Sequence, residues 1–453
     1  MQHVAMRTGE PLWREIPYAD PVLLVRRLRD RRHLTFLDSS LSHERLGRYS
    51  YVCCDPALTV SHNPLRSLNA LLAGHGLRRV EHLPPFQGGF AGLIAYEFGR
   101  LLEPTLLTRS PEPTIPIAQV HLYDKVISFD HVQRRAFLVT TGYPETDEPA
   151  RIARATAQLR ELETLLGRRE PKTGGEHCLK GWESNFTRPE YEAAVARTVD
   201  YILAGDIFQA NIAQRFSAPI TAGFDAFAFY EILRARNPAT FSAYLDYGPI
   251  KVASSSPERL LSFDGALAEA RPIKGTRRRD FDPGLDAALR ADLLASRKDR
   301  AENVMIVDLL RNDLSRVCEP GSVEVPVLCG LESYASVHHL VSVVNGRLAG
   351  GRPPLDLLWA CFPGGSITGA PKVRAMEIIA EIEKVPRNTY CGSIGWVGLD
   401  GRMDWNIAIR TVSFHDGIAS FHGGGGITAR SDPAAEYEET LTKVERILDS
   451  FAP

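Results

Sequence analysis

The sequence predicts a large α/β protein with a sheet-rich first half and a mixed second half, and three observations support this. Its 453 residues exceed what one small core needs, so one large body or two domains are expected. Short β-rich runs separated by Gly and Pro, such as residues 118–123, fill the first half. Near residue 182 a helix-start signal and an alternating strand follow a polar segment. We therefore expect a sheet-rich domain over 1–166, a linker over 167–181 and a second domain over 182–453.

Helix and linker signals mark the middle of the chain. A helix is expected over about residues 148–166, and the polar stretch after it, with Gly174-Gly175, is typical of a linker. A capping box then starts the next helix, because Thr187 is followed by Glu190 three residues later. Pro189 fits the first turn, and Gly205 marks the end of this helix.

A strand with two different faces is expected directly after this helix. Four apolar residues alternate with three polar ones: Phe208, Ala210, Ile212 and Phe216 against Gln209, Asn211 and Arg215. A polar face turned inward would line a cavity, whereas a half-exposed strand of an antiparallel sheet would show the same alternation. Periodicity alone favours the half-exposed strand.

Two further helices are expected in the second half. A long one spans about residues 285–310, and the last begins after Pro433. In the last helix one apolar stripe lies nearly opposite Glu439, and its members are Tyr437, Leu441, Val444 and Leu448. Glu436 and Glu439 are neighbours at i, i+3.

The composition argues against several kinds of partner. The 53 basic and 55 acidic residues nearly cancel, and no basic block predicts nucleic-acid or membrane-surface binding. The seven cysteines lack a CxxC pair and zinc spacing and are odd in number, which argues against a disulfide framework. No run of about 18 apolar residues predicts a membrane span, and no signal peptide is evident. We expect a cytoplasmic protein that acts on a small molecule or another protein.

Lys274 is the most informative single residue. It lies in the run Pro272–Thr276, where Gly-Thr follows a short apolar pair, as in a strand that ends in a tight turn. Arg271 precedes it, and three glutamates stand in other polar motifs, so a cation–carboxylate site is one hypothesis; they are Glu258, Glu302 and Glu439. The alternative is a solvated loop lysine, the usual environment of this residue type.

Two glycine-rich segments are candidates for anion binding. Gly364–Lys372 superficially resembles a phosphate loop, but Ala370-Pro371 separates the last glycine from the lysine, so the Walker spacing fails. What remains is a glycine-rich turn before a helix, whose free N–H groups could hold a carboxylate. Gly423–Gly426 would let a ligand approach the backbone without Cβ obstruction, or would form a tight strand end.

Carboxylates in several motifs allow metal or acid chemistry. Glu302 and Glu439 would suit Mg²⁺, which takes few protein ligands, but Glu439 could instead pair with Lys443 at i, i+4. The residues alone favour that ion pair. Glu258 follows a strand-like run over 252–255 and could be a general acid if burial raised its pKa, or could pair with an arginine. His338-His339 is not a zinc motif, because adjacent side chains face different directions.

Seven motifs in order resemble those of the chorismate-utilising enzymes. They are GDIFQANIAQRF, SPERLL, RPIKGT, DRAENVMIVDLLRND, PGGSITGAPKVRAMEII, CGSIGW and AEYEET. The match is continuous from about residue 182 to 448, and looser in the first half through PFQGGFAGLIAYEFGR at 85–100. The resemblance implies two large facing antiparallel sheets with helices outside. It makes 182–453 the chorismate-binding catalytic domain and 1–166 similar to the N-terminal domain of anthranilate synthase component I.

The resemblance also implies roles for site residues. Glu302, Glu436 and Glu439 match the Mg²⁺ ligands, and the metal would hold the ring carboxylate of chorismate. Tyr390 and Arg410 match positions that bind the enolpyruvyl carboxylate. The remaining substrate-site positions include backbone donors, and they are Gln209, Thr276, His339, Gly365, Ser366, Thr368, Gly424, Gly425 and Gly426.

Two positions separate the subfamilies. Water-adding relatives, the isochorismate and salicylate synthases, carry a general-base lysine where this chain has Gln209, so ammonia is the expected nucleophile. Anthranilate synthases use ammonia as well, but have a small residue, usually alanine, where Lys274 stands. The motifs therefore most resemble the aminodeoxychorismate synthases, component I. Anthranilate synthase component I and a non-catalytic binding subunit are the alternatives.

The implied reaction uses Lys274 as a nucleophile at C2 of chorismate and Glu258 as the acid that protonates the departing C4 hydroxyl. Ammonia then attacks C4 and expels the lysine, whose pKa must be lowered by burial and by cations such as Mg²⁺ and Arg271. His339 matches a histidine linked to pyruvate loss in anthranilate synthases and would here only line the pocket.

The resemblance also implies a partner protein. No glutaminase nucleophile motif occurs in the chain, so ammonia is expected from a separate glutamine amidotransferase subunit or from free ammonium. Relatives often hold a tryptophan pocket in the first half, and Leu37–Ser39 lies where such a pocket would begin.

Overall fold

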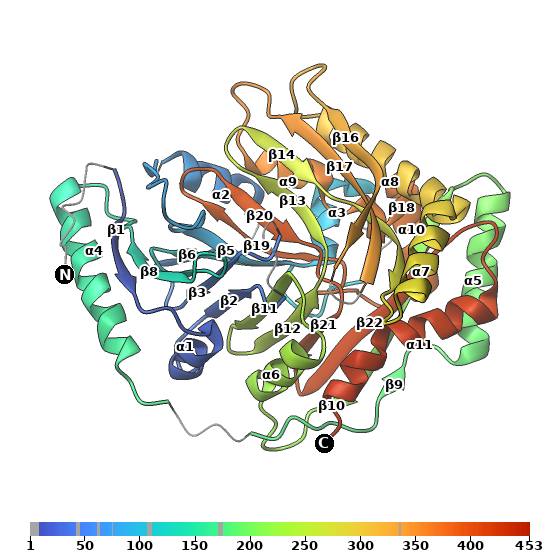
Figure 1. The fold of residues 1–453 in the computed structure, drawn as a ribbon, viewed down its shortest axis with the longest axis horizontal. Helices are drawn as coiled ribbons and strands as arrows, with labels where there is room; N and C mark the ends of the chain where they lie inside the picture. The colour runs from blue at the N-terminus through green and yellow to red at the C-terminus, as the bar shows by residue number, and fades with distance from the viewer. Residues whose placement is uncertain are drawn as a thin grey trace.

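Two large antiparallel sheets with helices outside them form the molecule, which confirms the predicted fold class (Figure 1). The structure is a computed structural model that describes residues 9–41, 46–60, 64–74, 76–106, 111–170, 175–334 and 337–453. Residues 171–174 of the predicted linker and the first eight residues of the chain lie outside this described part.

Sheet A contains strands from both ends of the chain. Its order is β1 (Leu12–Ile16), β8 (Arg135–Thr140), β7 (Lys125–Asp130), β3 (Tyr49–Cys53), β2 (Leu34–Asp38), β11 (Phe241–Asp246), β12 (Ile250–Ser256), β21 (Thr411–His415), β22 (Ile418–Ile427), β10 (Gln209–Pro219) and β18 (Gly369–Ala370), with β9 (Glu183–Ser184) also paired to β10.

Sheet B is built in the same way. Its order is β15 (Ile273–Arg278), β17 (Val337–Arg347), β14 (Leu267–Ala270), β13 (Arg259–Phe263), β20 (Met403–Asn406), β19 (Ser393–Gly398), β5 (Gly89–Ile94), β6 (Ala118–Tyr123) and β4 (Leu58–Val60), with β16 (Glu324–Ser333) also paired to β17. Each sheet therefore contains strands from both sides of the predicted linker at 167–181. The division into two domains stays a prediction.

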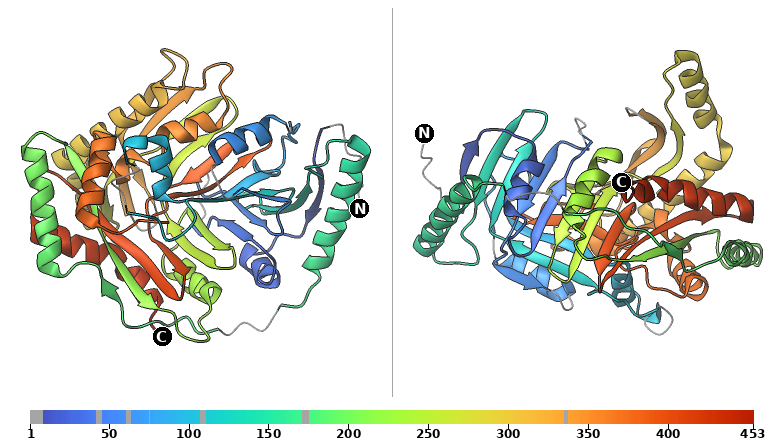
Figure 2. Two further views of the ribbon diagram at one scale, coloured as in Figure 1. Left: turned by 180° about the vertical axis from the view of Figure 1, so that it is seen from behind. Right: turned by 90° about the horizontal axis from the view of Figure 1, so that it is seen from below.

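Helices cover the outer faces of the sheets. They are α1 (Pro21–Leu28), α2 (Pro64–Ala73), α3 (Gly99–Leu102), α4 (Glu148–Leu166), α5 (Arg188–Leu203), α6 (Ala226–Arg236), α7 (Pro283–Ala295), α8 (Arg297–Ser315), α9 (Leu355–Cys361), α10 (Lys372–Glu383) and α11 (Pro433–Ser450), with 3-10 turns η1 (Tyr96–Phe98), η2 (Pro104–Leu106) and η3 (Gly365–Ile367). Figure 2 shows α4 and α5 at opposite ends of the molecule.

Apolar side chains hold the layers together. Between the sheets, Leu93 and Ile394 of sheet B share a buried cluster with Leu245 and Val252 of sheet A. Helices α1, α4, α6 and α11 pack on sheet A through a second cluster, and α8 and α9 pack on sheet B through a third. Burial of apolar area of this extent is the main stabilising contribution.

Several sequence predictions are confirmed in detail. Helix α4 spans 148–166 as expected, and β6 spans 118–123. The capping box forms at the start of α5, where Thr187 and Glu190 satisfy each other's backbone N–H groups. Gly205 follows α5 in the left-handed region with φ +84°, which suits glycine at a helix end.

Other predictions are wrong, each for a local reason. The helix expected over 285–310 is two helices, because Ser296 has an extended backbone and caps α8 by accepting from the Asp299 N–H. The polar face of β10 is buried, so the strand is not half-exposed, while Phe208 before it is exposed. The apolar stripe expected in α11 is incomplete rather than absent. Val444 is buried and Tyr437, Leu441 and Leu448 are partly buried against the core, but the fully buried face also includes Glu436, Thr440 and Ile447.

Candidate active site

A cavity of about 180 Å³ brings together residues from both sheets and α11. Its walls come from β10, the turn after β12, β15, η3, β22 and α11. The lining residues are Asn211, Glu258, Ile273, Lys274, Ser366, Ile367, Tyr390, Ile409, Arg410, His422, Gly423, Gly424, Gly426, Lys443 and Ile447. Seven of the predicted site residues are among them: Glu258, Lys274, Ser366, Tyr390, Arg410, Gly424 and Gly426.

Lys274 reaches this cavity from a bulge in β15. The strand begins at Ile273 and continues to Arg278, so the expected strand end at Gly275 is wrong. The pairing with β17 shifts register between Ile273 and Thr276, and Gly275 adopts φ +85°. A bulge re-aims a side chain that regular pairing would direct elsewhere, and here it directs the amine of Lys274 into the cavity.

The surroundings of Lys274 favour its neutral form. Burial lowers the pKa of Lys274, the Glu302 and Glu258 carboxylates oppose this, and the Lys443 ammonium adds to the lowering. No described residue forms a hydrogen bond or ion pair with Nζ of Lys274. Arg271 was expected to help lower the pKa of Lys274, but its guanidinium forms an ion pair with Glu332 instead.

Glu258 lines the same cavity as Lys274 and lies two residues after the end of β12. Its side chain is buried, and its Oε1 accepts a hydrogen bond of 2.9 Å from the Ser366 hydroxyl. Burial raises the pKa of Glu258, while Ser366 and nearby cations moderate the rise. The arginine pair considered from sequence does not form, since Arg259 binds Asp404 instead. A carboxyl with a raised pKa suits a general acid.

Arg410, Tyr390 and the glycines of β22 line another part of the cavity. The Arg410 side chain has no acceptor among the described residues, and desolvation and Arg446 both lower its pKa. The Tyr390 ring stacks on the His422 ring at 4.9 Å and 7°. An unpaired guanidinium beside a buried phenol is suited to a carboxylate ligand.

The glycine run Gly423–Gly426 lies inside β22 and pairs with β10, so it is not a strand end. A Cβ on Gly424 would lie 2.6 Å from the Ile212 carbonyl oxygen, and one on Gly425 would lie 3.1 Å from Glu436 Oε2. A Cβ on Gly426 would meet Gln209 Nε2 at 2.6 Å and Lys274 Nζ at 3.6 Å. The missing side chains therefore leave room for the groups around the cavity.

Six predicted substrate-site residues do not line the cavity. Gln209 is fully buried, and neither atom of its amide has a hydrogen-bond partner among the described residues. Thr276 and His339 bond each other at 2.9 Å, and burial lowers the pKa of His339 to about 4. The other three belong to the surrounding backbone and are Gly365, Thr368 and Gly425. His338 is structural, with bonds to Ser333 and Asp286.

The three predicted metal ligands lie beside the cavity on α8 and α11. Glu302 Oε1 is buried without a hydrogen-bond partner, and burial raises the pKa of Glu302. Burial also raises the pKa of Glu436, and Glu439 contributes to that rise. Burial would raise the pKa of Glu439 too, but the Lys443 ammonium at 2.7 Å outweighs it, so the Glu439–Lys443 pair considered from sequence does form.

These carboxylates fit a hard divalent cation by their chemistry. Among the described residues, no three His, Cys, Asp or Glu side chains stand close enough to hold a metal without other ligands. Mg²⁺ takes one or two carboxylates and completes its shell with water and substrate oxygens, so it does not need such a cluster. The unpartnered oxygen of Glu302 and the mutual repulsion of Glu436 and Glu439 are consistent with a site that gains from a cation.

Sequence reasoning missed two lining residues. Lys443 Nζ donates to the Gly424 carbonyl oxygen at 2.9 Å and also binds Glu439. Its i, i+4 spacing from Glu439 was visible in the sequence, but only the packing of α11 on β22 places it at the cavity. His422 gave no signal, because its place depends on the stack with Tyr390.

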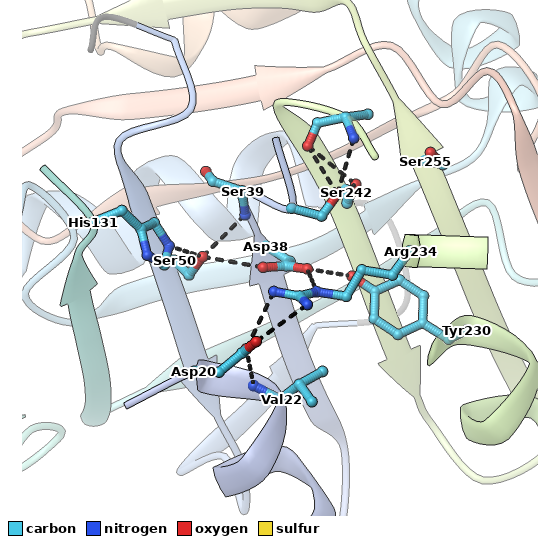
Figure 3. Close-up of polar contacts among 12 residues, drawn as sticks. Asp20, Val22, Asp38, Ser39, Ser50, His131, Tyr230, Arg234, Ser242 and Ser255 are labelled. Atoms are coloured by element: carbon cyan, nitrogen blue, oxygen red, sulfur yellow. Dashed lines mark hydrogen bonds and ion pairs between the residues drawn. The ribbon is translucent and has the colours of Figure 1, made fainter. Parts of the chain in front are cut away.

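A larger cavity of about 540 Å³ is lined by strands of both sheets and by residues of both halves of the chain, and Leu37–Ser39 contribute to its lining as expected for the N-terminal pocket. Asp38 is buried beside it and accepts hydrogen bonds from Arg234, Tyr230 and Ser50 at 2.6, 2.9 and 3.2 Å (Figure 3). The carboxylate of Asp38 is thus bound within the protein and joins β2 to α6.

Comparisons with known proteins decide the family. The family model described as chorismate binding enzyme matches residues 38–449. The chain belongs to this family. It is 42% identical over 414 residues to anthranilate synthase component 1 of Streptomyces coelicolor, covering 89% of this chain and 80% of that protein. It is 43% identical over 364 residues to aminodeoxychorismate synthase component 1 of Salmonella typhimurium, covering 80% and 77%.

Solved structures agree with this fold. Anthranilate synthase component I from Streptococcus pneumoniae superposes with a TM-score of 0.79 at 30% identity, over 90% of this chain and 94% of that chain. The menaquinone-specific isochorismate synthase MenF of Escherichia coli gives 0.76 at 18% identity, over 98% and 96%, and supports the fold alone. No helix in the described residues is long and apolar enough to cross a membrane. The chain is therefore a chorismate-binding enzyme, and overall identity does not separate two aminating activities.

Proposed function

We propose that this chain is the aminating component of an aminodeoxychorismate synthase, which replaces the C4 hydroxyl of chorismate by an amino group on the way to 4-aminobenzoate and folate. The observation that carries the proposal is Lys274, an amine with a lowered pKa that lines the same small cavity as a buried carboxyl, Glu258. The resemblance implies a small residue at this position in anthranilate synthases, so Lys274 would distinguish the two activities that overall identity leaves equal.

The residues can carry the two substitutions in sequence. Neutral Lys274 attacks C2 and forms the C–N bond, the ring double bonds shift, and the C4–O bond breaks as Glu258 delivers its proton to release water. The lysine nitrogen is then a secondary ammonium and Glu258 a carboxylate. Ammonia attacks C4, the double bonds shift back and the lysine leaves as a neutral amine. Glu258 takes a proton from the new C4 ammonium, which restores both residues.

The remaining residues bind and orient the substrate. Arg410 and Tyr390 would hold the enolpyruvyl carboxylate, and the glycines of β22 would allow close approach of the ring. Glu302 and Glu439, with Glu436 nearby, would hold Mg²⁺ together with water and substrate oxygens, and the bound ion would neutralise the ring carboxylate of chorismate. His339 would remain outside the chemistry, since the product keeps its enolpyruvyl group.

A separate subunit is proposed as the ammonia source. Two relatives are named component 1, which supports a second component. The chain has no glutaminase nucleophile motif, so a glutamine amidotransferase is the partner that the chemistry requires. A cytoplasmic location suits both the cysteine usage and this pathway, and remains part of the proposal.

Product analysis tests the proposal directly. The purified chain is incubated with chorismate, Mg²⁺ and ammonium, and products are separated by chromatography. We expect 4-amino-4-deoxychorismate without pyruvate. Anthranilate plus pyruvate as the main products would reject the proposal in favour of anthranilate synthase, and binding of chorismate without turnover would favour a non-catalytic subunit.

Glu302→Gln should raise the Mg²⁺ concentration needed for half-maximal rate. An unchanged Mg²⁺ requirement would argue against the metal assignment.

A further inference from the structure

A fully buried arginine lies behind the cavity, outside the groups that react. Arg387 is 1% exposed and follows α10. Its guanidinium forms a two-pronged pair with Glu383, with Nε to Oε2 at 2.9 Å and Nη2 to Oε1 at 2.6 Å. A guanidinium has five N–H groups, so this pair leaves others free to donate to backbone carbonyl oxygens.

Those remaining N–H groups hold two pieces of the cavity wall. Nη1 donates to the Ile367 carbonyl oxygen in η3 at 3.0 Å, and Nη2 donates to the Asn211 carbonyl oxygen in β10 at 2.6 Å. Ile367 and Asn211 both line the cavity. The guanidinium also lies over the Tyr390 ring, 5.5 Å from its centre. One side chain thus fixes three separate segments of the substrate site.

Two carboxylates fix the arginine itself. Glu383 accepts a third hydrogen bond, from the Ala213 N–H at 2.9 Å, and so ties α10 to β10. Glu97, from the sheet-rich first half, accepts from the backbone N–H of Arg387 at 2.7 Å and of Asn388 at 3.1 Å. The turn then closes from the Tyr390 N–H to the Arg387 carbonyl oxygen at 2.9 Å, which sets the place of Tyr390.

We propose that Arg387 is a positioning residue for chorismate, which holds Asn211, Ile367 and Tyr390 in their places around the substrate. Glu383 and Glu97 orient it. The inference rests on the proposed function only in taking chorismate as the occupant of the cavity. Lysine cannot replace the arginine, because its point charge has no planar fork to bind Glu383 and two carbonyl oxygens together.

Arg151 is a matched control. It is 2% exposed, forms a two-pronged pair with Glu148 at 2.9 Å on both bonds, and donates to the Thr141 carbonyl oxygen at 2.9 Å. Its guanidinium lies over the Tyr143 ring at 5.6 Å. Arg151 therefore has the same kinds of contact as Arg387, but it stands in α4, away from the cavity.

The test compares Arg387→Lys with Arg151→Lys by steady-state consumption of chorismate with ammonium and Mg²⁺, after thermal unfolding confirms that each variant is folded. Displacement of the wall should raise KM for chorismate at least about tenfold in Arg387→Lys, since misplacement of about 1 Å can cost on the order of 10²-fold. Arg151→Lys should keep KM and kcat within twofold. Glu383→Gln, which leaves the arginine in place, should raise KM in the same direction and supplies the test if Arg387→Lys does not fold.

Coupling to Tyr390 separates positioning from a general loss of folded protein. In a Tyr390→Phe background, the factor by which Arg387→Lys lowers kcat/KM for chorismate should be at least threefold smaller than in the wild type. A simple fall in the folded fraction would lower kcat/KM by the same factor in both backgrounds. Equal KM values for Arg387→Lys and Arg151→Lys, or no coupling, would overturn the inference. The rate is measured on chorismate, so anthranilate as the wild-type product would reject C4 amination and leave this comparison readable.

Discussion

Replacement of Lys274 by alanine should remove most C4 amination while leaving the fold intact. The side chain projects from a bulge in β15, and no described residue forms a hydrogen bond or ion pair with its amine. Truncation therefore costs little packing, and we expect the free energy of unfolding to change by less than about 1 kcal/mol. What is lost is the reacting amine, whose lowered pKa suits a nucleophile.

The size of the effect follows from what a held nucleophile supplies. Well-oriented intramolecular reactions gain about 7 kcal/mol or more over their bimolecular counterparts. If half of that, about 3.5 kcal/mol, depends on Lys274, formation of the 4-amino product falls about 400-fold. The site then has the small residue of the anthranilate synthases, so we expect the remaining turnover to shift towards anthranilate.

Two measurements check this prediction. Chromatography gives the rate of each product, and mass spectrometry of acid-quenched protein should find an adduct of chorismate less one water on the wild type but not on Lys274→Ala. Lys251→Ala is the control, because that lysine is partly exposed, lies outside the lining of the cavity and forms an ion pair with Asp246 at 2.9 Å. An unaltered rate and product in Lys274→Ala would show that Lys274 is not a nucleophile.

Four further predictions concern the acid, the pH dependence of the rate, the glycines and the buried Asp38. Glu258→Gln should lower kcat by about 10²–10⁴-fold, the usual contribution of a general acid, and equal rates would remove that role. The reaction needs Glu258 protonated and Lys274 neutral. Wild-type kcat/KM should therefore fall at high pH as Glu258 ionises, with a pKa above the ordinary glutamate value, and at low pH as Lys274 is protonated. A flat profile from pH 5 to 10 would contradict these two roles. The Cβ of Gly424→Ala would collide with backbone and should cost about 1–3 kcal/mol of stability. The Cβ of Gly425→Ala would contact the Glu436 carboxylate and should mainly raise the Mg²⁺ concentration needed for half-maximal rate. The reverse pattern in unfolding and activity assays would refute these placements. Asp38→Asn should weaken the hydrogen bonds that this buried carboxylate accepts from Arg234 and Tyr230, while Arg234 keeps its pair with Asp20. We expect a loss of about 1.5–3 kcal/mol in chemical unfolding, against under about 1 kcal/mol for the exposed Asp30→Asn, and equal losses would contradict the network.

Much of the local structure could be predicted because its causes are local. Helix α4, the capping box at Thr187 and the strand at 118–123 depend on residues within a few positions of one another. The break at Ser296 was missed for a related reason: apolar periodicity continues through the residue, while its hydroxyl caps the following helix. The burial of the polar face of β10 could not be read from alternation, because a half-exposed strand and a cavity wall show the same pattern.

By itself, the sequence determined the chemistry that the chain carries. The order of its motifs places the chain in one family, and the identity of Lys274, Gln209 and Glu258 supports the proposal of an aminating member, because residue type sets which atoms can react. The tertiary structure alone decided how those atoms meet: the bulge that turns Lys274 inward, the packing of α11 that brings Lys443 to Gly424, and the Glu97 contact by which the first half holds Arg387. Each depends on pairing between segments far apart in the chain, and sequence periodicity carries no information about which distant segments pair.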